Sequence, residues 1–283
     1  MYLGGDCMKY VKCYPGFKLK AVTFSFDDGT FQDYEMVNML NHYNMKGTFN
    51  VNSKLMYKNS YFTMCGWIKN YRLEKHQVVD LFKGHEIASH TSTHTGFENL
   101  SDSLLKEQID DDIASLSKLA KYKIEGFAYP FGIYNDTIIQ RLKDNGIVYA
   151  RSTKCQYNFN IPSNFYTYGG TCTISCQSFP KLVNKWVKLS PKTMKMFYIW
   201  GHSYELDMFH EHEKTFDLYG KIANKEDTWY VTNIELFKYL NAFKKLRYYK
   251  NSNKFINNSN IDLYVKVNND EFIIKANSSL IIK

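Results

Sequence analysis

The sequence lacks the cysteine patterns that mark small zinc domains and thiol–disulfide oxidoreductases. It has no C-x-x-C pair, and no His or Cys stands at zinc-ligand spacing beside the two closest cysteines. The six cysteines are scattered, at Cys7, Cys13, Cys65, Cys155, Cys172 and Cys176. We therefore expect thiols rather than a zinc cluster.

The sequence also lacks a long hydrophobic run. Residues 1–7 have neither the basic stretch nor the apolar stretch of a signal peptide, and no segment resembles a spanning helix. As written, the sequence predicts a cytoplasmic protein with no membrane span, and it leaves open a trimmed chain or another route of export. No motif that reads DNA or RNA accompanies the dispersed lysines, so nucleic acid is not an expected partner, and no partner protein is indicated.

Apolar and aromatic residues are plentiful. The 283 residues are 44% hydrophobic and 17% aromatic, which argues against disorder and allows one large α/β domain with a buried core. The net charge of +8 is compatible with attraction to an anionic cell wall or membrane surface.

Strand-like and helix-like segments alternate along the chain. Strand-like runs lie near residues 21–26, 47–51, 86–89, 126–129, 147–151 and 196–200. An apolar stripe predicts a helix over 103–121, a second helix follows Asn135, and a capping box at Thr232 and Glu235 opens a third. Such alternation, with polar candidates at strand ends, indicates a parallel barrel.

Two adjacent carboxylates, Asp27 and Asp28, follow the apolar run 21–26. Neighbouring residues on a strand point to opposite faces, but a turn at the strand's end would let both carboxylates enter one pocket. Asp28-Gly29 is also a common turn pair, so a plain turn is the alternative interpretation.

Two histidines, His90 and His94, stand four residues apart further along the chain. On a helical turn that spacing would place both rings on one face, where they could share a metal ion. One carboxylate and two imidazoles can hold a divalent ion and leave a coordination position open. The other carboxylate could then act as a base, and His202 could supply an acid.

With these motifs the chain resembles the polysaccharide deacetylases, carbohydrate esterase family 4, also called the NodB-homology domain. Residues 25–29 (SFDDG) resemble the first family motif, and 90–94 (HTSTH) resemble the second. Residues 128–132 (AYPFG) and 198–202 (YIWGH) resemble the third and last motifs less closely. The resemblance covers residues 20–245 and implies an incomplete (β/α)7 barrel.

The resemblance also implies a role for each matching residue. Asp28, His90 and His94 would hold one divalent metal ion, zinc or else cobalt, nickel or manganese. Asp27 would take a proton from the attacking water, and His202 would protonate the leaving amine. The backbone N–H of Phe131 would help to stabilise the oxyanion. Further candidates for lining the pocket are Pro130, Trp200 and Tyr204.

The chain departs from the family pattern at two places. Ala128 stands where the third motif has the arginine that orients the catalytic aspartate, and residues 155–190 contain no match to the family's Asp-plus-Trp motif. Without a cationic partner the pKa of Asp27 would rise, so another group is expected to hold this carboxylate.

The pattern changes after residue 245. Residues 248–260 are rich in Asn, Lys and Ser and are expected to form a turn-rich connector, whereas 261–267, 271–275 and 280–282 are strand-like. We therefore expect a barrel over residues 1–245 and a small β appendage over 246–283 that packs on it. Structural cover is its expected role, with glycan binding as the alternative.

The expected function is metal-dependent hydrolysis of N-acetyl groups on the amino sugars of a polysaccharide or oligosaccharide. One alternative is hydrolysis of a small or cyclic amide by the same site. The other is an inactive module that binds glycan or metal, because the arginine of the third motif is missing.

Overall fold

A curved sheet of parallel strands forms the centre of the molecule. The computed structural model describes residues 9–66, 68–98 and 100–282. Seven strands run parallel in the order β8-β7-β6-β3-β2-β10-β9, and the short β11 pairs with the first part of β2. Their bounds are β2 Lys20–Asp27, β3 Gly47–Val51, β6 Glu86–Ser89, β7 Gly126–Ala128, β8 Tyr149–Arg151, β9 Cys172–Thr173, β10 Lys195–Gly201 and β11 Thr228–Tyr230. The predicted incomplete (β/α)7 barrel is confirmed.

The β2 strand is the central strand of the barrel. All eight of its residues are buried, and β10 pairs with one of its edges while β11 and β3 share the other. A strand buried on both sides consists of apolar, β-branched and aromatic residues without regular alternation. This explains why the run 21–26 was recognisable from the sequence.

Helices cover the outside of the sheet. They are α1 Asp33–His42, α2 Lys75–Leu81, α3 Asp102–Leu105, α4 Asp111–Ala120, α5 Asp136–Asp144, α6 Phe179–Val187, α7 Glu205–Phe209, α8 His212–Ile222 and α9 Asn233–Lys244. A π-helical turn at Lys106–Asp110 joins α3 to α4, so the predicted helix over 103–121 is present with a local irregularity. The predicted capping box at Thr232 and Glu235 opens α9, and Asn135 caps α5.

Two small antiparallel sheets lie at one end of the barrel. One contains β1 Tyr10–Cys13, β14 Leu263–Val267 and β15 Asp270–Ile274; the other contains β12 Leu246–Tyr249, β13 Lys254–Asn257 and β16 Ser278–Ile281. The prediction of a turn-rich connector over residues 248–260 was wrong, since β12 ends and β13 forms within this segment. Side chains of both sheets join a core cluster with α9, β2 and β10, so the two sheets pack on the barrel. The boundary between residues 245 and 246 stays a prediction.

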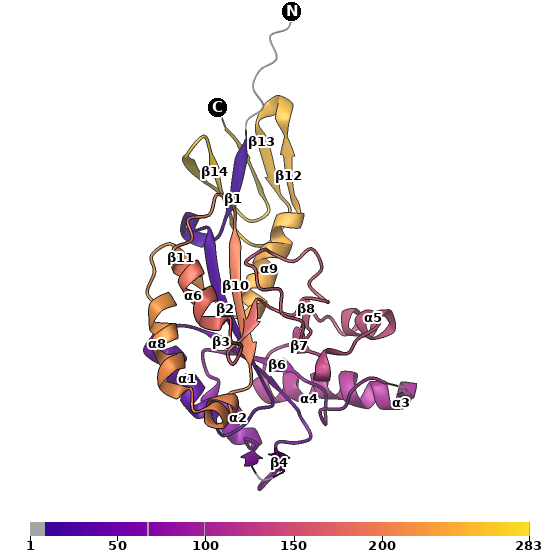
Figure 1. Cartoon of the computed structure of the whole chain (residues 1–283). Helices are drawn as coiled ribbons and strands as arrows, with labels where there is room; N and C mark the ends of the chain where they lie inside the picture. The colour runs from indigo at the N-terminus through magenta and orange to yellow at the C-terminus, as the bar shows by residue number, and fades with distance from the viewer. Residues whose placement is uncertain (1–8, 67, 99, 283) are drawn as a thin grey trace, which may run out of the picture.

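The opposite end of the molecule carries the carboxyl ends of the barrel strands. A hairpin that the sequence did not reveal, β4 Tyr61–Met64 with β5 Ile68–Tyr71, lies at this end, far from the appendage (Figure 1). Short 3-10 turns occur at Pro15–Phe17, Pro130–Gly132 and Lys250–Ser252.

The part of the chain that the structure describes has no helix long and apolar enough to cross a membrane. Its five cysteines are free thiols, as expected, and Cys7 lies outside the described residues.

Candidate active site

The adjacent carboxylates meet in one pocket because the chain turns sharply after β2. Asp27 is the last residue of β2, and Asp28 and Gly29 both have positive φ, +82° and +61°. A Cβ at position 29 would lie 2.9 Å from Val51 Cγ1, so glycine is required there for space as well as for conformation. Both carboxylates are almost fully buried, at 3% and 6% exposure.

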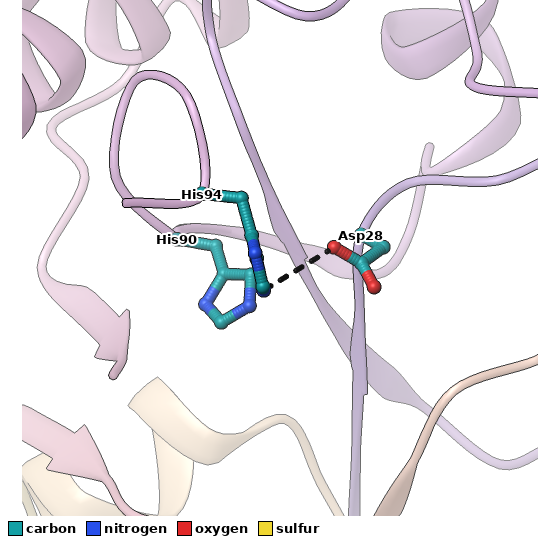
Figure 2. Close-up of side chains that lie close together, drawn as sticks. All are labelled: Asp28, His90 and His94. Atoms are coloured by element: carbon teal, nitrogen blue, oxygen red, sulfur yellow. Dashed lines mark ion pairs between the residues drawn. The ribbon is translucent and has the colours of Figure 1, made fainter. Parts of the chain in front are cut away.

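The two histidines are brought together by a tight loop after β6, and not by the helical turn that their spacing suggested. Thr91 and His94 have positive φ, +66° and +56°, and no helix is assigned between residues 90 and 94. The ring centroids of His90 and His94 are nevertheless only 4.8 Å apart. Both imidazoles lie on the same side of the loop and face Asp28 (Figure 2).

Asp28, His90 and His94 have the geometry of a metal-ligand set. One ligand atom from each lies within 4.8 Å of the others, and His94 Nε2 is 3.7 Å from Asp28 Oδ1. The Nδ1–H of His90 donates to the Ala128 carbonyl at 2.8 Å, which leaves Nε2 free to bind an ion. Burial lowers the pKa of His90 to about 4 and also lowers that of His94, so both rings are neutral, as ligands must be. The residues present therefore fit a divalent ion.

Arg151, the last residue of β8, supplies the cationic partner of Asp27 that Ala128 cannot. Its guanidinium donates to both oxygens of Asp27, and Asn50 Nδ2 donates to Oδ1 at 2.8 Å. Burial alone would raise the pKa of Asp27, but Arg151, together with His90 and His202, lowers it to about 2. The carboxylate is thus held in place and kept ionised, as the departure from the family motif required.

Trp200 supports this arginine and does not line the pocket. Its ring lies 4.4 Å from the Arg151 guanidinium carbon and is only 5% exposed. A flat guanidinium stacks well on an aromatic face, so Trp200 fixes the direction from which Arg151 approaches Asp27.

His202 faces the carboxylates from the end of β10. Its Nε2 lies 3.9 Å from Asp27 Oδ2 and 3.9 Å from Asp28 Oδ2. On the other side of the ring, Nδ1–H donates to Glu205 Oε1 at 2.8 Å. Burial opposes protonation of His202, but Glu205 and the two aspartates outweigh it and raise the pKa to about 9. Glu205 is a partner to which sequence analysis had assigned no role.

A second buried arginine, Arg72, was also missed by sequence analysis. Its Nη1 donates to the backbone oxygen of Asp28 at 2.6 Å and to Asn52 Oδ1 at 2.8 Å, and lies 3.4 Å from Asp28 Oδ1. The ring of Phe62 covers its guanidinium at 4.8 Å. No local motif surrounds Arg72, which directly follows the unpredicted β5 strand.

The pocket above these groups has a volume of about 400 Å³ and apolar walls. Phe62 and Met64 come from the hairpin, Phe131 and Tyr129 from the loop after β7, and Tyr204 from the segment after β10. Tyr204 also stacks on His202, with ring centroids 4.9 Å apart. Pro130 is buried and, like Trp200, is not among the residues lining this pocket.

Phe131 contributes to the pocket through both side chain and backbone. Its ring is 63% exposed and lies edge-on to His94, with centroids 4.8 Å apart. Its φ of +59° turns the backbone at this point, and no hydrogen-bond acceptor for its N–H is found among the described residues. This N–H is therefore able to donate to a ligand.

Comparisons with known proteins identify the same family. The model of the family "polysaccharide deacetylase" matches residues 16–150, a segment that contains Asp27, Asp28, His90 and His94 and ends just before Arg151. No match was found among curated proteins.

Several solved structures share the fold. A candidate polysaccharide deacetylase from Mycobacterium smegmatis is 12% identical, with a TM-score of 0.58 over 83% of this chain and 94% of that one. A family 4 acetyl xylan esterase from Clostridium thermocellum, solved with a cobalt ion, is 20% identical and has a TM-score of 0.51. The alignment covers 77% of this chain and 90% of that one.

A shorter alignment relates the chain to a Streptococcus pyogenes deacetylase solved with acetate. The two are 26% identical with a TM-score of 0.40, and the alignment covers 46% of this chain and 55% of that one. The chain thus spans about half the length of that protein. Together with the site geometry, the comparisons lead to one conclusion: residues 16–150 match the polysaccharide deacetylase family, and the chain has the fold of the family 4 carbohydrate esterases.

Proposed function

We propose that this protein is a metal-dependent hydrolase that removes N-acetyl groups from the amino sugars of a polysaccharide or oligosaccharide. The observation that carries the proposal is geometric: the side chains of Asp27 and His202 lie 3.9 Å apart beside the three candidate metal ligands, and their pKa values are shifted in opposite directions. Asp27 has a pKa of about 2 and His202 a pKa of about 9, so at neutral pH one is an ionised base and the other a protonated acid. Environments that separate two pKa values in this way are typical of acid–base catalysis.

Each residue has a part in the proposed reaction. A divalent ion at Asp28, His90 and His94 would lower the pKa of water to about 7 and polarise the acetyl carbonyl. Asp27 accepts the proton of the attacking water, and Arg151 keeps this carboxylate ionised and oriented. The Phe131 N–H donates to the developing oxyanion, and His202 gives its proton to the leaving amine, which departs poorly unless protonated.

The same features argue against an inactive binding module. Holding a charged arginine–aspartate pair in a buried site requires removing both ions from water, which costs several kcal/mol per ion before they attract each other. A module that only binds metal or glycan has no need of a second ionised carboxylate and a protonated histidine beside the metal ligands. Asp27 keeps its partner Arg151 and His202 keeps its partner Glu205, and both pairs favour a catalytic role over binding alone.

Acetate release tests the proposed function. N-acetylated oligosaccharides incubated with the protein and zinc, cobalt, nickel or manganese should yield free acetate, and a chelator should stop the reaction. If neither acetate nor ammonia appears from any N-acetyl sugar or cyclic amide with metal present, the hydrolase proposal is wrong.

Removing either candidate histidine ligand should reduce metal binding. In His90→Ala and in His94→Ala we expect metal content, measured by elemental analysis after gentle purification, to fall well below the roughly one ion per chain expected of the parent. His85→Ala is the matched control, since His85 lies outside this pocket and bonds to the Gly47 N–H and Asn41. Unchanged metal content in both ligand variants would move the metal site elsewhere.

Replacing Glu205 should shift the pH dependence of the reaction. Glu205→Gln removes the carboxylate that helps to raise the pKa of His202, so His202 should lose its proton at lower pH. An acid works only while protonated, so activity is lost as pH rises through its pKa. We expect the alkaline limb of the kcat/KM profile to move to lower pH, whereas a purely structural role for Glu205 would lower activity at all pH values without moving that limb.

A further inference from the structure

The hairpin that forms one wall of the pocket has two different faces. Side chains alternate along β4 and β5, so Phe62 and Met64 point inward and line the pocket, while Tyr61 and Tyr71 point outward. Tyr61 and Tyr71 are directly opposite each other in the strand pairing, and their ring centroids are 5.6 Å apart. Both rings are open to solvent, at 49% and 43% exposure.

A cation lies over one ring of this outer face. The Lys69 ammonium lies 4.9 Å from the centre of the Tyr61 ring, within the range of a cation–π contact. Tyr61, Tyr71 and Lys69 form what we call the hairpin platform. Because Phe62 is the next residue after Tyr61, the platform and the pocket wall are the two sides of one strand.

In the segments that follow β2, β3, β7 and β8, the large apolar side chains that are exposed are aromatic. Seven large apolar side chains are exposed in the described segments that follow β2, β3, β7 and β8 (28–32, 52–74, 129–135 and 152–171): two phenylalanines, Phe31 and Phe131, and the tyrosines at 57, 61, 71, 134 and 157. The exposed aliphatic residues Val79, Leu104, Val187, Ile273 and Ile281 lie in helices or in the appendage. Exposed aromatic rings are therefore found in these segments without exposed aliphatic ones.

This composition fits a carbohydrate better than a protein or a lipid. The flat face of a tyrosine packs against the C–H groups of a pyranose ring, while its hydroxyl and a nearby lysine can bond to the sugar's oxygens. A surface that docks on lipid or on an apolar protein patch would be expected to expose Leu, Ile or Val as well.

The size of the pocket indicates why such a platform would be used. At about 400 Å³ the pocket is near the lower end of ligand-site volumes, so it is too small to enclose a polymer. The neighbouring residues of a polymer must then lie outside it, across the rim. The hairpin platform lies on the opposite face of the strand that carries Phe62 and Met64, so a chain that crosses the edge of the hairpin can reach it.

We propose that the hairpin platform binds a pyranose chain that extends from the active-site pocket, so that the protein acts on polymers in preference to short oligosaccharides. The inference rests on the proposed deacetylase function and deepens it by assigning Tyr61 and Tyr71 to substrate length. These two residues bind and orient the chain and take no part in the chemical step.

The test compares substrates of two lengths and two insoluble polymers. The kcat/KM values are measured for the dimer and the hexamer of β-1,4-linked N-acetylglucosamine, and sedimentation measures binding to the insoluble polymer of this sugar and to peptidoglycan. In Tyr61→Ala/Tyr71→Ala we expect binding to polymer and kcat/KM for the hexamer to fall about tenfold, the effect of losing aromatic anchors, with the dimer unchanged. Tyr249→Ala is the matched control, since Tyr249 is 47% exposed on β12 at the other end of the molecule and should leave all values unchanged (Figure 1).

Different outcomes separate the platform from the chemistry. If the double variant keeps the parent's hexamer-to-dimer ratio and its polymer binding, the platform proposal is wrong while the hydrolase proposal stands. If the parent hydrolyses nothing, sedimentation still decides on the platform, and a parent that binds neither polymer overturns it. If the double variant also turns over the dimer more slowly, the hairpin has shifted. The single Tyr61→Ala variant is then compared with the parent by the hexamer-to-dimer ratio of kcat/KM, and an unchanged ratio contradicts the proposal. A change of oligomeric state on size exclusion in the double variant would instead identify a protein interface and contradict the proposal.

Discussion

Replacing Asp27 with asparagine is expected to lower turnover by ~10²–10⁴-fold, the usual contribution of a positioned base. Asparagine keeps the size of the side chain but cannot accept a proton at neutral pH. Because Asp27 is not among the candidate ligands, metal content should stay the same. Acetate release and elemental analysis on the same preparation measure both effects.

Asp28→Asn is the matched comparison for this experiment. It alters the neighbouring carboxylate, which is a candidate ligand, and a neutral amide binds a cation less well than a carboxylate. We expect this variant to lose metal and to recover part of its activity when metal is added in excess. Equal loss of metal in both variants, with activity following occupancy, would show that the roles of the two aspartates were assigned incorrectly.

Replacing Arg151 with methionine is expected to have the largest effect on stability. Both partners are nearly inaccessible, with Arg151 at 1% and Asp27 at 3% exposure, so the variant leaves a buried carboxylate without its cation. Breaking a buried ion pair from one side typically lowers the free energy of unfolding by about 3–5 kcal/mol. Denaturant unfolding of the metal-free protein measures this loss, and turnover should fall with it.

The pH dependence of that loss has a definite sign. In the parent, the pKa of Asp27 is depressed to about 2, so its stabilising contribution is present above the unfolded pKa and is lost as pH falls toward 2. Without Arg151, burial is expected to raise the pKa of Asp27. At low pH the carboxyl group should then be protonated, and burying the neutral group destabilises the fold less than burying the charged one. We therefore expect the destabilisation by Arg151→Met to be smaller at pH 4 than at pH 7.

A double variant provides the control. Arg151→Met/Asp27→Asn removes both charges, and replacing both partners of a buried pair is often close to neutral for stability. We expect it to unfold at a higher denaturant concentration than Arg151→Met alone. If the double variant is no more stable than the single one, the cost comes from the lost packing against Trp200, and the ion pair is not its source.

The sequence made the barrel strands and the candidate metal ligands recognisable because both are local patterns. Residues 21–26 of β2 form a mainly apolar run that ends at the two carboxylates, and the two histidines follow β6 within five residues. The approximate bounds of β2 were recognisable because a strand that is buried on both faces is rich in apolar and β-branched residues.

The loop conformation at the histidines was not recognisable. The spacing of His90 and His94 fits a helical turn, yet positive φ at Thr91 and His94 produces the same closeness by a tight loop. Spacing limits how far apart two side chains can be, but it does not specify the backbone path between them.

The sequence by itself determined the barrel and which side chains would be available at its end. Only the tertiary structure decided which residues hydrogen-bond to these side chains and hold them in place. Arg151 bonds to the carboxylate of a residue 124 positions earlier, and Arg72 bonds to the backbone carbonyl of a residue 44 positions earlier. The hairpin closes a pocket whose other walls come from five separate segments. A curved sheet brings the ends of distant strands together, so any cation at the end of a neighbouring strand can supply the charge that Ala128 lacks. Which cation pairs with Asp27 depends on the direction of side chains across the barrel, and no local sequence pattern contains this information.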